Sequence, residues 1–268
     1  MIFATLANCA QLANAEVLAG SIKRHYPDAY TVLCLIGEIK AYSQSSFFDE
    51  TVFISVKQNG DEFGPLSPYK AYLVHSLLQS HDEPVIYMDA RSRIYAPIDE
   101  LIDELERKNI VGVPFISEPQ DNVEEEIERL RKGTVNAGLL ALRPNEHTRK
   151  FAAWWLSRVS ADYFGPSRHA DSEHRWLSLA MDPFGLHLFK HPAYHLSAWN
   201  AHEKRRMLRV ENDHFFAGGS PLKTACFDEA NVRLDRQTDA PGSLAFHQLA
   251  LRYSEECAAI LSGKEPVL

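Results

Sequence analysis

The sequence predicts an α/β protein whose mostly parallel sheet is flanked by helices and followed by an irregular C-terminal part. Short apolar runs alternate with segments of helical period over the first two-thirds of the chain. One apolar run, residues 84–88, ends in an acidic residue before a new helical period begins. Residues 213–242 are instead rich in Gly, Pro and Asp and show no period. Strands that alternate with helices are typical of βαβ units, whose strands run parallel.

The N-terminal half contains most of the predicted strands. The first helix places Ala15, Leu18 and Ile22 on one stripe. In the second, Ser67 is expected to cap the N-terminus and Pro68 to take the first helical position. Because the alternation begins at once, we expect residues 1–117 to form a nucleotide-binding half. The strands are predicted at residues 2–6, 30–36, 51–56, 84–88 and 110–115, and the helices at 14–26, 67–80 and 97–108.

The second half carries longer helices and fewer strands. The helix at 145–159 has Phe151, Trp155 and Val159 on one face, which indicates a side buried against the sheet. The length of 268 residues suits one large α/β domain or two small ones, and we expect a single domain, residues 1–268. The other predicted elements are a charged helix at 121–131, a strand at 136–143, a short helix at 171–181 and a last helix at 243–261.

The composition excludes several classes of protein. A hydrophobic share of 45% and a charged share of 24% are those of an ordinary globular domain. The net charge of -8 argues against a dedicated nucleic-acid surface, so no nucleic acid partner is expected. No apolar run reaches the length of a membrane span, and the first residues lack the pattern of a signal peptide. Four widely spaced cysteines indicate reduced thiols and a cytoplasmic protein, for which peripheral attachment to the inner membrane stays an open alternative.

The most informative segment is Val85-Ile86-Tyr87-Met88-Asp89-Ala90-Arg91. In open α/β sheets ligands bind at the carboxyl ends of the strands, so Asp89 is expected to face a ligand. Residues i and i+2 of an extended segment share a face, which places Arg91 beside Asp89. A carboxylate is a hard ligand for a divalent ion, whereas a guanidinium binds phosphate oxygens directly. The competing interpretation is a structural ion pair between the two side chains at a strand end.

Several further segments occur in a characteristic order, and together with the strand end they resemble nucleotide-sugar-dependent glycosyltransferases of the GT-A type. This family includes glycogenin-like and lipopolysaccharide sugar transferases. Its strand-end pattern is Asp-x-Asp, in which Arg91 stands here in place of the second acid. The resembling segments are residues 12–29, Pro68-Tyr69-Lys70-Ala71-Tyr72-Leu73, Asn136-Ala137-Gly138, Asp171, Ala198-Trp199-Asn200-Ala201-His202-Glu203-Lys204 and Ala245-Phe246-His247.

The resemblance implies a GT-A-like, Rossmann-type fold and a hexosyltransferase-like enzyme that moves a sugar from a nucleotide-diphosphate donor to an acceptor hydroxyl. Residues 118–268 would then form the half that binds sugar and acceptor, the acceptor being a glycan, a lipid-linked sugar or a protein. Asp171 and Asn136 are the implied catalytic residues. Asp89 and His247 would hold a divalent Mn or Mg ion, which Arg91 puts in question. The implied donor-binding residues are Thr5, Ala7, Asn8, Lys70, Asp89, Ala90, Arg91, Gly138, Trp199 and Asn200.

Each of these assignments has a structural alternative. Lys70 is also readable as a solvated charge, Asn136 as a turn residue, Asp171 as a helix cap and Trp199 as a core residue. The loss of the second acid also permits a catalytically degenerate protein that binds nucleotide sugar or a protein partner without turnover. A nucleotidyltransferase is disfavoured, because residues 5–11 contain no glycine-rich loop after the first strand.

Overall fold

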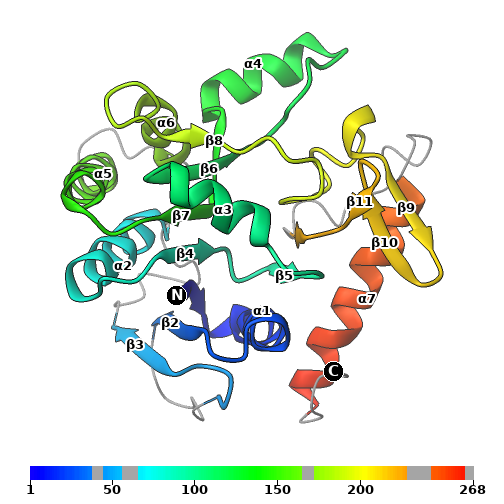
Figure 1. The fold of residues 1–268 in the computed structure, drawn as a ribbon, viewed down its shortest axis with the longest axis horizontal. Helices are drawn as coiled ribbons and strands as arrows, with labels where there is room; N and C mark the ends of the chain where they lie inside the picture. The colour runs from blue at the N-terminus through cyan, green and yellow to red at the C-terminus, as the bar shows by residue number, and fades with distance from the viewer. Residues whose placement is uncertain (38–44, 56–65, 165–171, 228–242, 263–268) are drawn as a thin grey trace.

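The computed structural model describes residues 1–37, 45–55, 66–164, 172–227 and 243–262. Its centre is a sheet with the strand order β3-β2-β1-β4-β7-β6-β8 (Figure 1). Strands β1 to β4 run parallel to one another, and β7 runs antiparallel to both of its neighbours, β4 and β6. The strands are β1 (Ile2–Asn8), β2 (Tyr30–Ile36), β3 (Glu50–Ile54), β4 (Val85–Met88), β6 (Ile110–Pro114), β7 (Val135–Leu142) and β8 (His187–Leu188).

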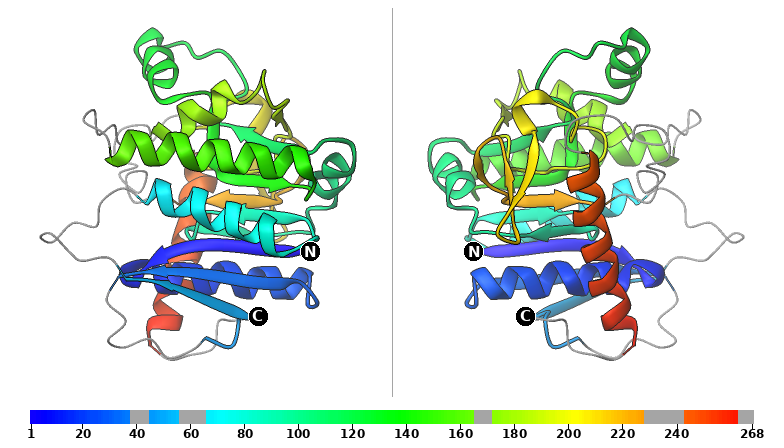
Figure 2. Two further views of the ribbon diagram at one scale, coloured as in Figure 1. Left: turned by 90° about the vertical axis from the view of Figure 1, so that its left-hand side faces the viewer. Right: turned by 90° about the vertical axis from the view of Figure 1, so that its right-hand side faces the viewer.

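Helices cover both faces of this sheet, which explains why its strands read as continuous apolar runs. Alternate residues of a strand point to opposite faces. In β1, Ile2, Ala4 and Leu6 belong to the apolar core beneath α2 (Ser67–Ser80) and α5 (Glu146–Phe164). Phe3 lies in the core on the other side, beneath α1 (Leu12–His25) and α3 (Asp99–Arg107). The left view of Figure 2 shows α2 and α5 in front of the sheet.

The predicted fold class, a mostly parallel sheet flanked by helices, is therefore confirmed. The predicted helical stripe of Phe151, Trp155 and Val159 is buried in the core. One detail of α2 was predicted wrongly: Leu66 occupies the N-cap position, so that Ser67 is already helical and makes no capping bond. The remaining helices are α4 (Val123–Lys132), which projects from the body in Figure 2, α6 (Ser172–Leu179) and α7 (Ser243–Leu261).

The described part of the segment predicted as irregular contains strands, so that this prediction was wrong for residues 213–227. Asn212 and Asp213 have φ values of 48° and 67°, which suit the tight turn of a hairpin between β9 (Leu208–Glu211) and β10 (His214–Ala217). Then β11 (Ser220–Pro221) pairs with β10, and β12 (Thr224–Cys226) pairs with β5 (Ser92–Ile94). Residues 228–242 lie outside the described residues.

Two further observations limit the class of protein. All four cysteines, Cys9, Cys34, Cys226 and Cys257, are free thiols. Within the described ranges, no helix combines the length and the apolar character needed to cross a bilayer.

Candidate active site at the switch point of the sheet

The order in which the strands are added to the sheet reverses between β1 and β4. From β1 the chain adds β2 and then β3 on one side, and it returns to place β4 on the other. The carboxyl ends of such neighbouring strands leave a crevice, which is the usual ligand site of open α/β sheets. Asn8 ends β1 and Asp89 follows β4 at this edge. Because β7 is antiparallel, it begins at the same edge and brings Asn136 there.

Asp89 and Arg91 form the pair that the sequence placed on one face. The Asp89 backbone N–H donates to the Gly138 carbonyl oxygen at 2.8 Å, which fixes the strand end against β7. The Arg91 backbone N–H and Nε donate to Asp89 Oδ1 at 3.1 and 3.3 Å. The two side chains, Arg91 and Asp89, keep 21% and 24% of their surface exposed, so they are within reach of a ligand. Burial raises the pKa of Asp89, but Arg91 and Lys70 lower it by more, and the carboxyl is ionised.

Lys70 lies in the interior, so that its interpretation as a solvated surface charge was wrong. Its Nζ donates to Glu173 Oε1 at 2.9 Å, and both side chains are less than a tenth exposed. The ammonium also lies 5.2 Å from the centre of the Tyr87 ring. Burial raises the pKa of Glu173, while Lys70 and His174 outweigh it and lower the net value. Glu173 on α6 is a charged residue of this region that sequence reasoning missed, although it lies two positions after Asp171.

His195 is the second residue that sequence reasoning missed. Its ring packs on Gly138, where an added Cβ would lie 2.8 Å from His195 Cε1. The side chain is 1% exposed, and neither ring nitrogen has a hydrogen-bond partner among the described residues. Burial lowers the pKa of His195 to about 3, although the charge of Asp89 opposes this shift, so the imidazole is neutral. The Asn136 side chain accepts the Gly138 N–H at 2.7 Å, and its Oδ1 lies next to the same position of the added Cβ, at 3.0 Å.

Residues 5–8 of β1 also reach this edge, but their side chains are mostly buried or bonded locally. The Thr5 hydroxyl is buried and donates to the Met88 carbonyl oxygen at 2.8 Å, and Ala7 and Ala90 are also buried. The half-buried Asn8 accepts from the Gln11 N–H and caps the short 3₁₀ helix η1 (Cys9–Gln11). The donor contacts predicted for these residues stay predictions.

Trp199 and Asn200 both contact His195, and we call the residues that surround His195 the frame. The Asn200 amide donates to the carbonyl oxygens of Phe115 and His195 at 3.2 and 3.1 Å. The Trp199 ring packs edge-on against Phe115 and lies 6.0 Å from the His195 ring, and its buried Nε1 has no partner among the described residues. Trp199 thus packs against Phe115 and also lies next to the His195 ring. Its predicted role in donor binding stays a prediction.

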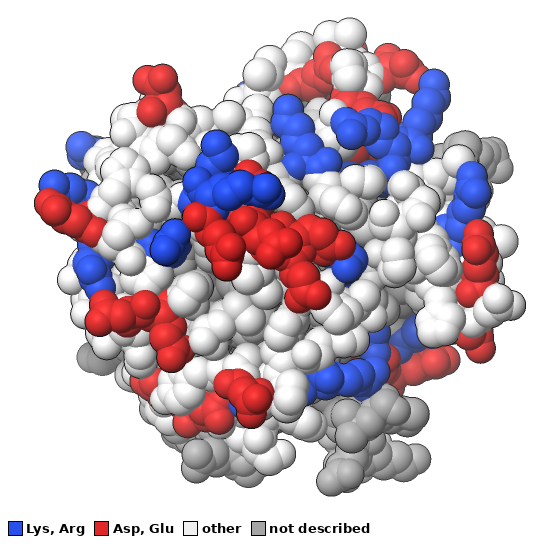
Figure 3. All heavy atoms as spheres, in the orientation of Figure 1, with Lys and Arg blue, Asp and Glu red and all other residues white. Residues whose placement is uncertain are grey.

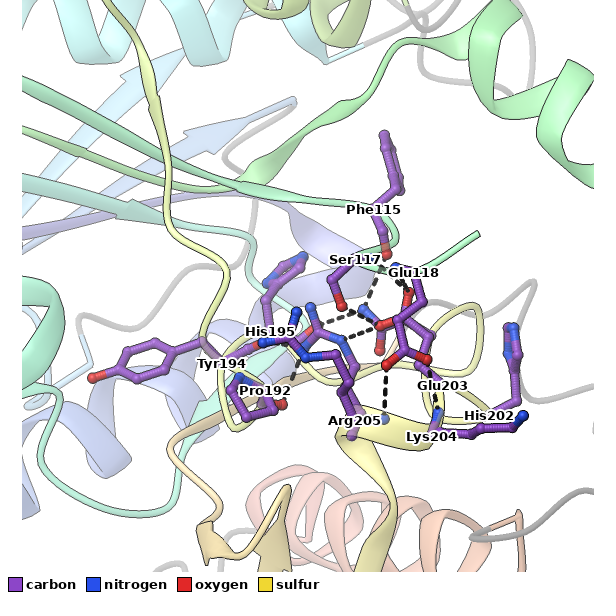
Figure 4. A network of polar contacts seen from close by, with 12 residues as sticks. Phe115, Ser117, Glu118, Pro192, Tyr194, His195, His202, Glu203, Lys204 and Arg205 are labelled. Carbon is purple, nitrogen blue, oxygen red and sulfur yellow. Dashed lines mark hydrogen bonds and ion pairs between the residues drawn. The ribbon is translucent and has the colours of Figure 1, made fainter. Parts of the chain in front are cut away.

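A polar network holds this frame to the end of β6 (Figure 4). Glu203, which is 3% exposed, accepts from the Ser117 N–H and hydroxyl at 2.5 and 2.6 Å. Arg206 Nε donates to the same carboxylate at 2.7 Å, and its NH1 donates to the carbonyl oxygens of Pro192 and Tyr194. The segment 198–204 that resembled a family block therefore ties the loop after β6 to His195.

The two remaining predicted site residues are Asp171 and His247. Asp171 lies outside the described residues. His247 is exposed on α7, a helix that packs against α1 and β9. Its pairing with Asp89 at a metal ion stays a prediction.

The described residues around Asp89 supply few ligands for a divalent ion. Asp89 supplies a carboxylate, but its Oδ1 already accepts from a cation, Arg91. The described ranges hold no cluster of three or more His, Cys, Asp or Glu side chains arranged to bind a metal. Arg91 and Lys70 both lie close enough to lower the pKa of Asp89, and these two cations are matched by the carboxylates of Asp89 and Glu173.

Comparisons with known proteins agree with this fold. No family model and no curated protein matches the chain. Among solved structures, the galactosyltransferase LgtC in complex with donor and acceptor sugar analogs is 16% identical, with a TM-score of 0.53 over 93% of this chain and 95% of LgtC. An active-site mutant of LgtC, also 16% identical, gives a TM-score of 0.56. The glycosyltransferase GlyE of Streptococcus pneumoniae TIGR4 is 13% identical and gives 0.57, and this chain spans 62% of its length. The chain therefore shares the fold of GT-A-type glycosyltransferases.

Proposed function

We propose that the protein is a glycosyltransferase that moves a sugar from a nucleotide-diphosphate donor to an acceptor hydroxyl. The observation that supports this most is the strand edge at the switch point, where Asp89 and Arg91 lie beside the buried pair Lys70–Glu173 and the ring of His195. Cations for a diphosphate and neutral polar groups for a sugar are what such a reaction needs.

The diphosphate would be held by Arg91. When the bond to the sugar breaks, negative charge develops on the departing diphosphate, and a fixed cation stabilises it most in the transition state. Asp89 orients the guanidinium through the bond between its Oδ1 and Arg91 Nε, so less conformational freedom is lost on binding. Lys70 adds a second positive charge, held in place by Glu173.

The sugar would lie against β7. Gly138 has no side chain, which lets the His195 ring pack directly on the β7 backbone at this edge. The neutral His195 imidazole can donate one hydrogen bond and accept another, and neither nitrogen uses this capacity within the described residues. Asn136 would contact sugar hydroxyls, and Asp171 would be the acid beside the reacting carbon. In this proposal, residues 1–117 bind the nucleotide and residues 118–268 bind sugar and acceptor, which is a glycan, a lipid-linked sugar or a protein.

Titration calorimetry with UDP, GDP, CDP and ADP tests the donor site. We expect saturable binding of at least one diphosphate, weakened about tenfold or more in Arg91→Gln, because a charge-assisted bidentate contact is lost. Arg107→Gln is the matched control, since Arg107 is an exposed arginine paired with Glu104 elsewhere on the surface. Binding of none of the four at millimolar concentration refutes the proposal.

Transfer is tested separately with the corresponding nucleotide sugars. Asp171→Ala is expected to lower the rate of donor hydrolysis or transfer by about 10²- to 10⁴-fold while donor binding changes little. Equal losses in binding and rate would indicate a folding or capping role for Asp171. Donor binding without hydrolysis or transfer by the wild-type protein would favour the degenerate, binding-only alternative.

A further inference from the structure

The charged helix α4 turns its apolar side away from the protein. Val123, Ile127 and Leu130 lie at positions i, i+4 and i+7, which form one stripe along a helix. Among the described residues, these side chains are 64%, 42% and 74% exposed. On most surface helices such a stripe faces the core. An apolar stripe that faces solvent instead marks a surface for interaction.

Contacts on the polar side of α4 fix this orientation. Glu126 Oε1 accepts from the Gln120 backbone N–H, in the loop after β6, at 2.9 Å. The Arg129 guanidinium lies 5.3 Å from the centre of the Phe115 ring. Because these two side chains face the body, the apolar stripe of the projecting helix stays accessible to a partner (Figure 2). A rotation of α4 that buried the stripe would break both contacts.

The charges of α4 are ordered along the helix. Acids come first and bases occupy the last turn, so two copies in antiparallel orientation place opposite charges against each other. At the top of Figure 3, where Figure 1 has α4, acidic and basic side chains lie together with uncharged surface. The acids with described side chains are Glu124, Glu126 and Glu128, and the bases are Arg129, Arg131 and Lys132.

One acid and one base are placed to pair across such a contact. Glu124 and Arg131 are seven residues apart, so they flank the apolar stripe on the same side of the helix. Both are exposed, and neither forms an ion pair within the described part of the chain. With a two-fold axis near Ile127, Ile127 meets its own copy. Glu124 of each copy then faces Arg131 of the other.

We propose that α4 is the contact surface of a homodimer, in which the apolar stripes of two copies pack antiparallel across a two-fold axis. Two helices of ten residues make a smaller contact than the roughly 1,600 Å² of a standard interface, so the dimer dissociates on dilution. A bilayer fits the helix less well, because its acids would be repelled by anionic head groups. The dimer does not depend on the reaction proposed above.

Sedimentation velocity of the full chain, from micromolar to millimolar concentration, tests the dimer. We expect a reversible equilibrium between monomer and dimer. Leu130→Gln is expected to weaken dimerisation about tenfold or more, because an apolar contact that the two-fold axis repeats is lost. Leu251→Gln is the matched control, since Leu251 is 51% exposed on α7, and it is expected to change nothing. Circular dichroism checks the fold of each variant.

Charge reversal tests the antiparallel register. Glu124→Lys and Arg131→Glu each place like charges opposite one another in a homodimer, and each is expected to weaken it about tenfold. An equimolar mixture of the two variants again has opposite charges at both places. The mixture is therefore expected to dimerise about as well as the wild type, whereas mixing would not rescue a helix that had unfolded.

Four results would overturn the proposal. The first is a protein that stays monomeric up to millimolar concentration. The second is dimerisation that survives Leu130→Gln, and the third is a mixture of the charge variants that does not recover. The fourth is binding to vesicles of phosphatidylglycerol and phosphatidylcholine that is lost in Leu130→Gln but kept in Leu251→Gln, because a bilayer would then cover the stripe.

Discussion

Two buried polar regions of this molecule lie close together and differ in how their atoms are satisfied. In the network around Glu203, both carboxylate oxygens accept hydrogen bonds, and the buried Arg206 donates to Glu203 and to two carbonyl oxygens. At the strand edge, both ring nitrogens of His195 lack a partner among the described residues, as does Glu173 Oε2. Leaving such atoms buried and unpaired costs free energy. The comparison separates a region that stabilises the fold from one that the proposed function uses to bind a ligand.

The largest expected effect on stability is in the satisfied network. Arg206→Ala leaves the Glu203 carboxylate buried without its cation, which we expect to lower the free energy of unfolding by about 3–5 kcal/mol. Urea denaturation measures it. Arg107→Gln breaks an exposed pair and is expected to cost less than about 1 kcal/mol. Similar losses in the two variants would contradict the contrast.

Gly138→Ala tests how closely His195 packs at the strand edge. The new Cβ would lie 2.8 Å from His195 Cε1 and 3.0 Å from Asn136 Oδ1, so the ring must move. We expect a loss of about 1–3 kcal/mol in unfolding free energy, together with weaker donor binding. The matched control is Gly20→Ala in α1, where the nearest atom is 3.6 Å away and a gain of up to about 1 kcal/mol is expected. If Gly138→Ala is as well tolerated as Gly20→Ala, the close packing is not real.

His195 should make stability depend on pH. Its pKa is about 3 in the folded state because of burial, against about 6.5 in the unfolded chain, so the unfolded state binds the proton more readily below pH 6.5. Stability is therefore fully present above pH 6.5 and falls as the pH drops, by about 2 kcal/mol between pH 6.5 and 5. His195→Gln is expected to remove this part of the slope in urea titrations. Equal slopes in wild type and His195→Gln would refute the assignment.

The smallest expected effect is that of a chelator. Since Arg91 supplies a cation where the Asp-x-Asp pattern has a second acid, wild-type activity should resist excess EDTA. Arg91→Asp restores that acid and is expected to create a metal requirement, because two hard oxygen ligands then share a face. Loss of wild-type activity with EDTA would show that Arg91 does not replace a metal ion.

Much of the fold could be predicted from apolar periodicity. The predicted strand at 30–36 and helices at 67–80 and 243–261 have the observed bounds. The strands β9 to β12 could not be found in this way. They are two to four residues long, and β12 is defined by its pairing with the distant β5, whereas β9, β10 and β11 pair with neighbours in the sequence. The N-cap of α2 was missed because serine is strongly preferred at this position, which pointed to Ser67, whereas the helix begins one residue earlier, after Leu66.

The candidate site was predictable where chemistry follows a strand. Asp89 and Arg91 were found because their spacing alone places them together. Glu173 and His195 were missed, since the sequence does not show that α6 lies over Lys70 or that His195 packs on Gly138. Lys70 stands among apolar residues in the sequence of α2. This pattern could have indicated that the lysine is buried and needs an acidic partner.

The pairing of β5 with β12 also bears on how the protein folds during synthesis. Ser92 pairs with Cys226 and Ile94 with Thr224, across nearly half of the chain. The Thr224 hydroxyl in turn accepts the His195 N–H at 2.7 Å. Contacts between such distant residues form slowly, because a long loop must close first. The first strands can pair while the ribosome is still translating, but the pocket that holds His195 is completed only after residue 226 has emerged.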